Sequence, residues 1–272
     1  MFKHSVWAVL ASTSLFFVPN AAAARPLQPA GPWDLDYGLT QCIASRNYGD
    51  AAKPTTLAIR QSPNGETYEI VLVRQGPPPE YAEELKASVD FGHGPIEAWL
   101  LHFGPEKPEA NLYQFRISAA QMAQARSADT VRLEIPGMPD VSFGLASMPQ
   151  LLDGLDACTA DLQRYWNMDG EKDGLIVRPA RGDLHGLFNS GDYPAEAIHR
   201  GQEGDSQYLL LVDEKGKVAG CQVLLASGVP VLDVMGCAVI QERGGFTPAL
   251  DKSGKAVRST VVTPKIRWQL SG

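Results

Sequence analysis

The sequence predicts an α+β protein with two domains, and three observations lead to this prediction. Short strand-like runs separated by turn residues occupy most of residues 55–145. A long amphipathic helix follows at residues 147–166. From residue 193 onward, the expected order changes to helix, strand, strand, helix, strand. A chain of 272 residues exceeds the usual size of one domain, so we expect a boundary between these two parts.

The first domain, residues 30–166, is expected to be a mainly antiparallel sheet with a C-terminal helix packed on it. Thr55–Arg60 and Tyr68–Arg74 flank the turn residues Pro-Asn-Gly at 63–65, which predicts a pair of adjacent strands. The other expected elements are strands at Glu97–Phe103, Leu112–Ile117, Thr130–Ile135 and Val141–Leu145 and a short helix, capped by Ser118, at Ala119–Ser127.

The helix at residues 147–166 is expected to start with Ser147 as its N-cap and Pro149 in its first turn. Apolar side chains recur along it at steps of three and four residues, which places them on one face. These side chains are Leu151, Leu155, Cys158, Leu162 and Tyr165. Cys158 therefore points into the core.

Residues 167–182 are rich in aspartate, glycine and charge, and we expect them to link the two domains. The triplet Arg181-Gly182-Asp183 matches an adhesion motif, but so short a match arises easily by chance, and we interpret it as a loop.

The second domain, residues 183–272, is expected to contain a helix from Tyr193 to Ile198, strands Gln207–Val212 and Val218–Ala226 around the turn Asp213–Lys217, a helix Val231–Glu242 and a last strand Ser259–Leu270.

Residues 1–24 have the pattern of a cleavable secretory signal. Lys3 and His4 precede an apolar run, and small residues at 21–24 predict cleavage after Ala24. The run is shorter than the roughly 20 residues of a membrane span, so we expect no stable membrane insertion after cleavage. An uncleaved anchor is the alternative interpretation. Loss of Lys3 changes the net charge from −7 to −8, and such an acidic protein is a poor candidate for nucleic-acid binding.

Four cysteines, all after residue 24, lie in a chain that we expect to meet an oxidising compartment. Three pairings are possible. Cys42 and Cys158 are the two cysteines of the first domain, and we expect them to bond. There is no C-x-x-C motif, and no cysteine has a histidine within five residues, so the sequence indicates neither a metal site nor a redox centre.

Catalytic residues are hard to find in the first domain. His93 and His102 could form a catalytic or metal-binding pair, but His102 lies in a strand-like run and is better interpreted as a partly buried structural residue. Glu83, Glu84 and Asp90 fit a solvated face. No nucleophile elbow, phosphate-binding loop or metalloprotease motif occurs. We therefore predict no catalytic residues, no metal and no cofactor, and a hydrolase in residues 30–166 remains an alternative.

The second domain resembles the C-terminal domain of TonB over residues 190–270. The matching features are Tyr193-Pro194 before small residues, Gly204 before the first strand, the hairpin from Asp213 to Val218, Phe246 with Pro248 after the second helix, and Trp268 in the last strand. The resemblance implies a non-enzymatic periplasmic binding module, a three-stranded antiparallel sheet with two helices on one face. It also implies that the last strand recruits a peptide of an outer-membrane transporter as an added strand.

Pro264 supports an edge position for the last strand, because a proline lacks the N–H that a central strand needs. We expect the peptide-binding part of this edge to be Lys265, Ile266, Arg267, Trp268, Gln269 and Leu270. A homodimer through the same strand is also possible. In the opposing interpretation, Pro264 protects the edge against aggregation and nothing binds there.

The topology that the resemblance implies brings Cys221 and Cys237 together. Val231, Val234, Cys237 and Ala238 share one helix face, which we expect to pack on the sheet, and Cys221, Val223 and Leu225 share a face of their strand. We therefore expect a Cys221–Cys237 disulfide, which contributes about 3 kcal/mol if it acts through loop entropy.

Departures from the family decide between the functional hypotheses. A TonB energy transducer keeps an N-terminal membrane anchor and a long proline-rich spacer, whereas this chain has a cleavable-looking signal and a folded domain in those places. The leading hypothesis is a soluble periplasmic protein that binds an envelope protein or a peptide of an outer-membrane transporter. The alternatives are an anchored energy transducer for transmembrane transport, the enzyme named above and a purely structural role.

Overall fold

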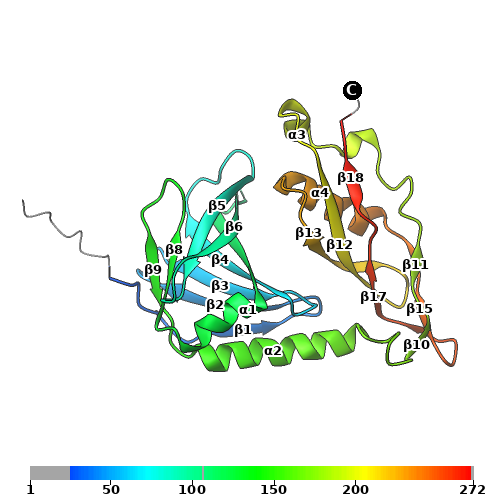
Figure 1. Ribbon diagram of the computed structural model, residues 1–272, viewed down its shortest axis with the longest axis horizontal. Helices are drawn as coiled ribbons and strands as arrows, with labels where there is room; N and C mark the ends of the chain where they lie inside the picture. The colour runs from blue at the N-terminus through cyan, green and yellow to red at the C-terminus, as the bar shows by residue number, and fades with distance from the viewer. Residues whose placement is uncertain (1–24, 106, 271–272) are drawn as a thin grey trace, which may run out of the picture.

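The computed structural model describes residues 25–105 and 107–270 (Figure 1). Its mixture of helices with a large antiparallel sheet confirms the α+β class. The N-terminal sheet has the strand order β1-β2-β3-β4-β7-β6-β5-β8-β9. Its strands are β1 (Asp34–Tyr37), β2 (Cys42–Tyr48), β3 (Thr55–Gln61), β4 (Thr67–Gln75), β5 (Glu83–Asp90), β6 (Ile96–Phe103), β7 (Ala110–Ser118), β8 (Thr130–Glu134) and β9 (Val141–Gly144).

The two ends of this sheet are tied together by the segment before β1. The backbone N–H of Leu27 donates to Ser142 O at 2.8 Å, and that of Ala30 donates to Asn47 O at 2.8 Å, so the segment lies between β9 and β2. The Tyr48 hydroxyl also donates to Gly144 O at 3.0 Å across the same junction. The sheet is therefore rolled, and its apolar core lies inside the roll.

Two helical segments pack on the N-terminal sheet, on its lower side in Figure 1. The first is α1 (Ala119–Met122), continued by a 3₁₀ turn at Ala123–Ser127, and Ser118 caps it as predicted, with Gln121 returning the hydrogen bond. The second is α2 (Met148–Tyr165), which packs on β1, β2 and β3. Ser147 precedes α2 but makes no side-chain capping bond, because its backbone is left-handed at φ +64°; the predicted cap is wrong in this respect.

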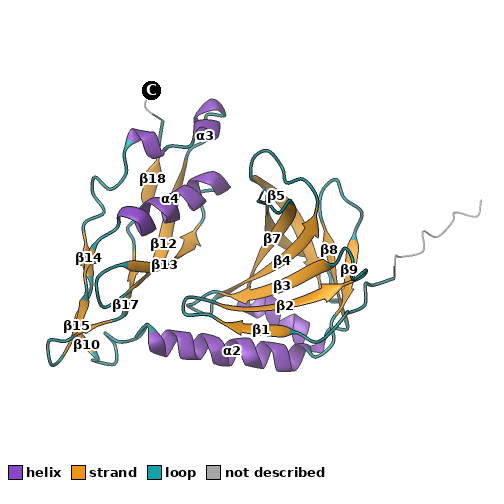
Figure 2. Cartoon of the chain, turned by 180° about the vertical axis from the view of Figure 1, so that it is seen from behind, coloured by secondary structure: helices purple, strands orange, loops and turns teal. Residues whose placement is uncertain are grey.

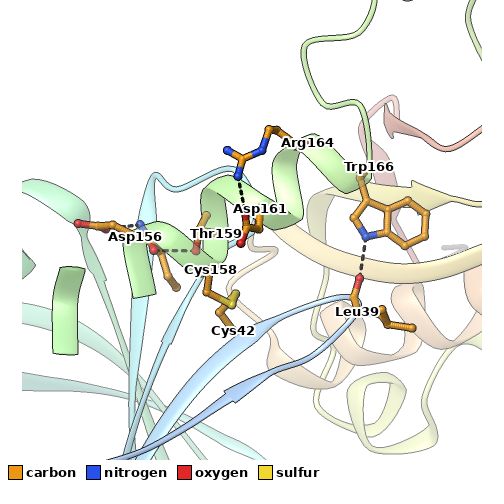
Figure 3. The surroundings of a disulfide bond; sticks show 9 residues. Leu39, Cys42, Asp156, Cys158, Thr159, Asp161, Arg164 and Trp166 are labelled. Atoms are coloured by element: carbon orange, nitrogen blue, oxygen red, sulfur yellow. Dashed lines mark hydrogen bonds and ion pairs between the residues drawn. A yellow bond between two sulfur atoms is a disulfide. The ribbon is translucent and has the colours of Figure 1, made fainter. Parts of the chain in front are cut away.

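The predicted Cys42–Cys158 disulfide is present and joins β2 to α2 (Figure 3). The Cα atoms of the two residues are 6.1 Å apart, and both side chains are buried. Leu151, Leu155 and Leu162 lie on the same buried face of α2. Tyr165 does not, and its exposed ring instead contacts the second domain.

Part of the expected linker forms short strands with the second domain. β10 (Ile176–Arg178) pairs with β15 (Ala249–Asp251), which also pairs with β16 (Ala256–Val257). β11 (Arg181–Gly182) pairs with β14 (Phe246–Thr247), so the loop predicted for the Arg181-Gly182-Asp183 triplet is wrong for its first two residues. The physical reason is a close approach: a Cβ at Gly182 would lie 2.6 Å from the Phe246 ring.

The second domain is built around β12 (Gly204–Val212), with β13 (Val218–Leu225) on one side. The turn between them is fixed by Asp213, whose Oδ1 accepts the backbone N–H groups of Lys215 and Lys217, each at 2.8 Å. Gly216 takes φ +81° in this turn, as the hairpin prediction required. The short 3₁₀ turn Ser190–Asp192 precedes α3 (Ala195–His199), and α4 (Pro230–Arg243) follows β13.

Both helices cover the same face of this sheet, as Figure 2 shows for α4 in front of β12 and β13. The buried face of α4 contains Leu232, Gly236, Val239 and Ile240. The predicted sheet-facing set was wrong for Val234, which is 60% exposed, and for Ala238, which is also exposed. The cause is the close contact of Gly236 with Tyr208, which turns the helix so that Cys237 lies at the margin of the buried face.

The Cys221–Cys237 disulfide nevertheless forms as predicted. The Cα atoms are 5.7 Å apart, and the bond joins β13 to α4. A residue at the margin of a helix face reaches the edge strand of the sheet more directly than a central one would. The staple therefore sits at the side of the sheet that β13 forms.

The end of α2 provides contacts between the domains (Figure 1). Leu162 and Trp166 pack against Leu211 of β12. The Asn167 side chain donates to Arg258 O at 2.8 Å, and the Arg258 guanidinium lies 3.9 Å from the centre of the Tyr165 ring. These apolar, hydrogen-bond and cation–π contacts place the C-terminal sheet beside the N-terminal one.

Candidate functional site

The expected last strand consists of two short strands, and the prediction of one continuous strand over Ser259–Leu270 is wrong. β17 (Ser259–Val262) pairs with residues 209–212 of β12, and β18 (Ile266–Trp268) pairs with residues 204–206. Two residues of β12 face three residues of the partner between these stretches, so residues 263–265 contain a bulge. Pro264 lies in it, and a bulge at a sheet edge is a position where proline is tolerated.

The bulge is held in place by Thr263. Its backbone N–H donates to Tyr208 O at 2.9 Å, and its hydroxyl accepts the Tyr208 N–H at 3.1 Å. The side chain of Gln207 donates to Thr263 O at 2.8 Å. The polar groups around the break are thus satisfied, and the two halves of the strand keep a fixed relation to β12.

Within the described residues, β12 is the sole strand that pairs with β17 and β18, so both lie at an edge of the sheet. Hydrogen-bonded pairs alternate along an antiparallel ladder, and Thr263 bonds Tyr208. Val261 and Ser259 therefore turn their main-chain groups to β12, whereas Thr260 and Val262 turn theirs outward. We call this outer side of β17 and β18 the edge site.

The six predicted peptide-binding residues divide into two groups. Trp268 is buried and Ile266 is half-buried, so their side chains serve the domain core. Arg267 forms an ion pair with Asp205 at 3.1 Å, and the backbone N–H of Leu270 donates to Glu203 at 2.8 Å. Lys265 and Gln269 are exposed. Any recognition here therefore depends on main-chain groups and exposed side chains, not on the tryptophan.

Trp268 anchors the edge site to the helices. Its ring meets Phe188 and Tyr193 edge-on at centroid distances of 5.5 and 5.6 Å, and it shares a buried cluster with Ala197 of α3 and Leu232 of α4. Its indole N–H donates to Ser206 Oγ at 3.1 Å. This contact explains why an aromatic residue closes the domain: it holds the edge strand against both helices.

Tyr208 completes the support behind the edge site. Its side chain is fully buried, and its hydroxyl donates to Ser206 Oγ at 2.8 Å. Burial raises the pKa of Tyr208 to about 12, so the side chain is neutral at physiological pH. The centre of β12 is therefore a tightly packed and uncharged support for the strands on both sides.

The two candidate histidines do not come together. His102 stacks on Tyr113 with ring centroids 4.3 Å apart, hydrogen-bonds Asn111 at 2.8 Å and lies 3.7 Å from Glu83, which confirms a partly buried structural role. His93 is exposed in the turn after β5, at the other end of the β5–β6 hairpin. At about 3.3 Å per residue, the length of β6 separates the two by roughly 20 Å. A site that uses both is excluded by this geometry.

The predicted solvated carboxylates have different surroundings from one another. Glu83 lies beside His102, and Asp90 accepts the backbone N–H groups of Gly92 and Gly94 at 2.7 and 3.1 Å. Glu84 is half-buried in a cleft between the domains, which the sequence prediction missed. No local pattern could reveal that cleft, because it is lined by segments from both domains.

We searched residues 25–105 and 107–270 for a membrane-spanning helix and for a metal-binding group. No helix there is long and apolar enough to cross a membrane, and no group of three or more histidine, cysteine, aspartate or glutamate side chains is arranged to hold a metal ion. The predicted signal segment, residues 1–24, lies outside the described residues.

The fold defines a small αββαβ module with an open sheet edge. The family described as the Gram-negative bacterial TonB protein C-terminal matches residues 190–270, which confirms the resemblance predicted from the sequence. The match begins at the 3₁₀ turn before α3 and ends just after β18. No curated protein matches the chain. The family match therefore covers the second domain and leaves residues 30–166 unassigned.

Proposed function

We propose that this chain is an exported, non-enzymatic protein of the bacterial envelope whose C-terminal domain binds a peptide segment of an outer-membrane transporter or a similar envelope component. The family match at residues 190–270 supports the class of partner. The observation that carries the proposal is the edge site, where β17 and β18 pair with β12 alone among the described strands. Added strands bind to such an edge through main-chain hydrogen bonds, and alternate side chains provide selectivity.

The edge site offers more to a partner on β17 than on β18. Val262 is 54% exposed, and its main-chain groups point away from β12, so a peptide can pair there without displacing any bond of the domain. Pro264 interrupts the edge next to it. A partner strand that includes Val262 and Thr260 therefore ends or bends at the bulge.

Replacing Val262 by proline tests this pairing. The substitution removes one outward N–H and leaves the ladder to β12 intact, because a proline is tolerated at an edge position whose N–H faces solvent. We expect binding of an N-terminal peptide from an outer-membrane transporter of the source bacterium to weaken by at least about tenfold. Isothermal calorimetry measures the affinity, and amide chemical shifts of residues 259–268 report its place.

The matched control for this variant is Val262→Thr, which keeps the N–H and the β-branched shape. It should bind like the unchanged protein. Equal affinity of Val262→Pro and Val262→Thr would contradict strand addition at β17. If the chain instead forms a homodimer through the same edge, sedimentation equilibrium will show a dimer that Val262→Pro dissociates.

Export is tested by the mature N-terminus. We expect mass spectrometry of the protein from the periplasmic fraction to show a chain that starts at Arg25, since residues 21–24 are all alanine, a small residue that signal peptidase accepts. A chain retained in the membrane fraction with its first 24 residues intact would favour the anchored energy transducer instead. The edge-site experiment keeps its meaning in either case.

A further inference from the structure

A second candidate binding region lies between the domains. A cleft of about 670 Å3 is bounded on one side by the outer face of the N-terminal sheet and on the other by β13 and α4. Its volume falls in the range of pockets that hold ligands, roughly 300–1,000 Å3. We call it the β13 cleft. It is separate from the edge site, which lies on the opposite side of β12.

The β13 cleft extends around the free edge of a strand. Consecutive residues 219–223 of β13 line it, and β13 pairs with β12 alone among the described strands. The lining also includes Leu211, whose side chain packs toward α2, and Cys237, which packs on the helix side of the sheet. Because both faces of the sheet contribute, the outer main-chain groups of β13 open into the cleft.

The opposite wall carries a cross-strand row of side chains. The strand registers place Arg60 beside Glu69, Glu69 beside Arg116, and Arg116 beside Trp99. The buried Glu69 carboxylate pairs with both arginines, so it neutralises one of their two positive charges. Trp99 ends the row with 59% of its surface exposed. The wall therefore offers a large aromatic ring beside two arginines that share one carboxylate.

Two carboxylates line the cleft from opposite domains. Asp233 of α4 is only 8% exposed and accepts the backbone N–H of Ser227 at 2.9 Å, and Glu84 comes from β5. Neither forms an ion pair with a basic side chain within the described residues. Burial raises the pKa of Glu84, and the charge of Asp233 raises it further; burial also raises the pKa of Asp233. The positive charge of Arg116 opposes both shifts without cancelling them, so the two carboxylates keep raised pKa values. A cation placed between them would stabilise both charged forms.

We propose that the β13 cleft binds an extended peptide that adds as a strand to the outer edge of β13 and places a lysine or arginine side chain between Glu84 and Asp233, against the ring of Trp99. The free edge selects an extended main chain, which a small amine could not supply. The two carboxylates and the aromatic ring select a cationic side chain. This inference does not rest on the edge site, and either can be true without the other.

Seven-residue peptides test the proposal on the full chain. The probe is acetyl-Thr-Val-Thr-Lys-Thr-Val-Thr-amide, and its matched analogues carry norleucine or glutamate in place of lysine. We expect the lysine peptide to bind at least about tenfold more tightly than the norleucine peptide, with the glutamate peptide weakest. The amide shifts of residues 219–223 should move on binding, and those of residues 259–262 should not.

Substitutions at the two carboxylates separate charge recognition from folding. Glu84→Gln and Asp233→Asn should each remove most of the preference for lysine over norleucine, and Asn keeps the oxygen that accepts from Ser227. Glu97→Gln is the matched control, because Glu97 is exposed on β6 and lies outside the cleft. It should leave the preference unchanged, as should Val262→Pro.

Three results would overturn the proposal. The first is equal binding of the lysine and norleucine peptides by the unchanged protein. The second is a set of shifts confined to residues 259–268, which would assign the peptides to the edge site. The third is no saturable binding of any of the peptides by the unchanged protein at millimolar concentration, with that protein shown to be folded by thermal denaturation.

Discussion

Replacing Cys42 and Cys158 together by alanine should lower the free energy of unfolding of the N-terminal domain by about 5 kcal/mol. The two residues are 116 positions apart, so their bond removes a large amount of conformational freedom from the unfolded chain. Both side chains are buried between β2 and α2, and no other covalent bond joins these elements in the described residues. Urea unfolding followed by circular dichroism measures the change.

The second disulfide is the matched comparison. Cys221 and Cys237 are only 16 positions apart, so the corresponding double alanine variant should lose about 3 kcal/mol, and the loss should appear in the unfolding of the C-terminal domain. The prediction is that the loss of stability is larger for the Cys42 and Cys158 variant than for the Cys221 and Cys237 variant. If the Cys42 and Cys158 variant unfolds at the same urea concentration as the unchanged protein, α2 is held by packing alone and the bond is dispensable.

The hairpins of the N-terminal domain could be predicted because their signals are local. β3 and β4 are short runs of β-branched and apolar residues that flank a Pro-Asn-Gly turn. β1, β2 and β5 carry no such signal and were missed. In β2, the inward positions include Arg46, which is buried because its guanidinium donates to Ala146 O at 3.0 Å. A buried arginine that is bonded to a residue far along the chain gives no alternation of apolar and polar residues.

The register of the last strand could not be predicted from the sequence pattern. Pro264 correctly indicated an edge, since within the described residues β17 and β18 pair with β12 alone. The extra residue between Val262 and Ile266 could not be predicted, because it depends on Thr263 replacing a backbone acceptor of the ladder with its hydroxyl. The bulge moves the expected binding region from Lys265–Leu270 toward β17, where outward main-chain groups are free of Pro264.

The β13 cleft could not be predicted from any single segment. Its walls come from strands of the N-terminal sheet, from β13 and from α4, and their relation is set by contacts at the end of α2. In the local sequence, Trp99 looks like any residue of a strand and Asp233 like any residue of a helix. Their surroundings in the cleft distinguish them. The Trp99 ring is exposed on one wall, and the Asp233 carboxylate is buried on the other.

Replacing Gly236 by alanine should destabilise the C-terminal domain by about 2–4 kcal/mol, although alanine favours a helix by about 1 kcal/mol over glycine. A Cβ at this position of α4 would lie 2.0 Å from the Tyr208 hydroxyl oxygen. Tyr208 is fully buried and bonded to Ser206, so it cannot move without losing that hydrogen bond and its packing. The steric cost therefore exceeds the helix preference. Urea unfolding of the C-terminal domain measures the result.

Gly154→Ala in α2 is the matched control. Its Cβ would meet the end of the Leu35 side chain at 2.9 Å, and that flexible group can rotate away at small cost, so the change in the free energy of unfolding should be within about 1 kcal/mol of zero. Adding Tyr208→Phe to Gly236→Ala removes the nearest clashing atom and should restore part of the loss. Since Tyr208 lies in β12 opposite the bulge of the edge site, Gly236→Ala should also weaken peptide binding there, and Tyr208→Phe should restore it in parallel with stability. A Gly236→Ala protein as stable as the unchanged one would show that α4 can shift on the sheet, and the close packing of helix and strand would then not be what holds the edge in place.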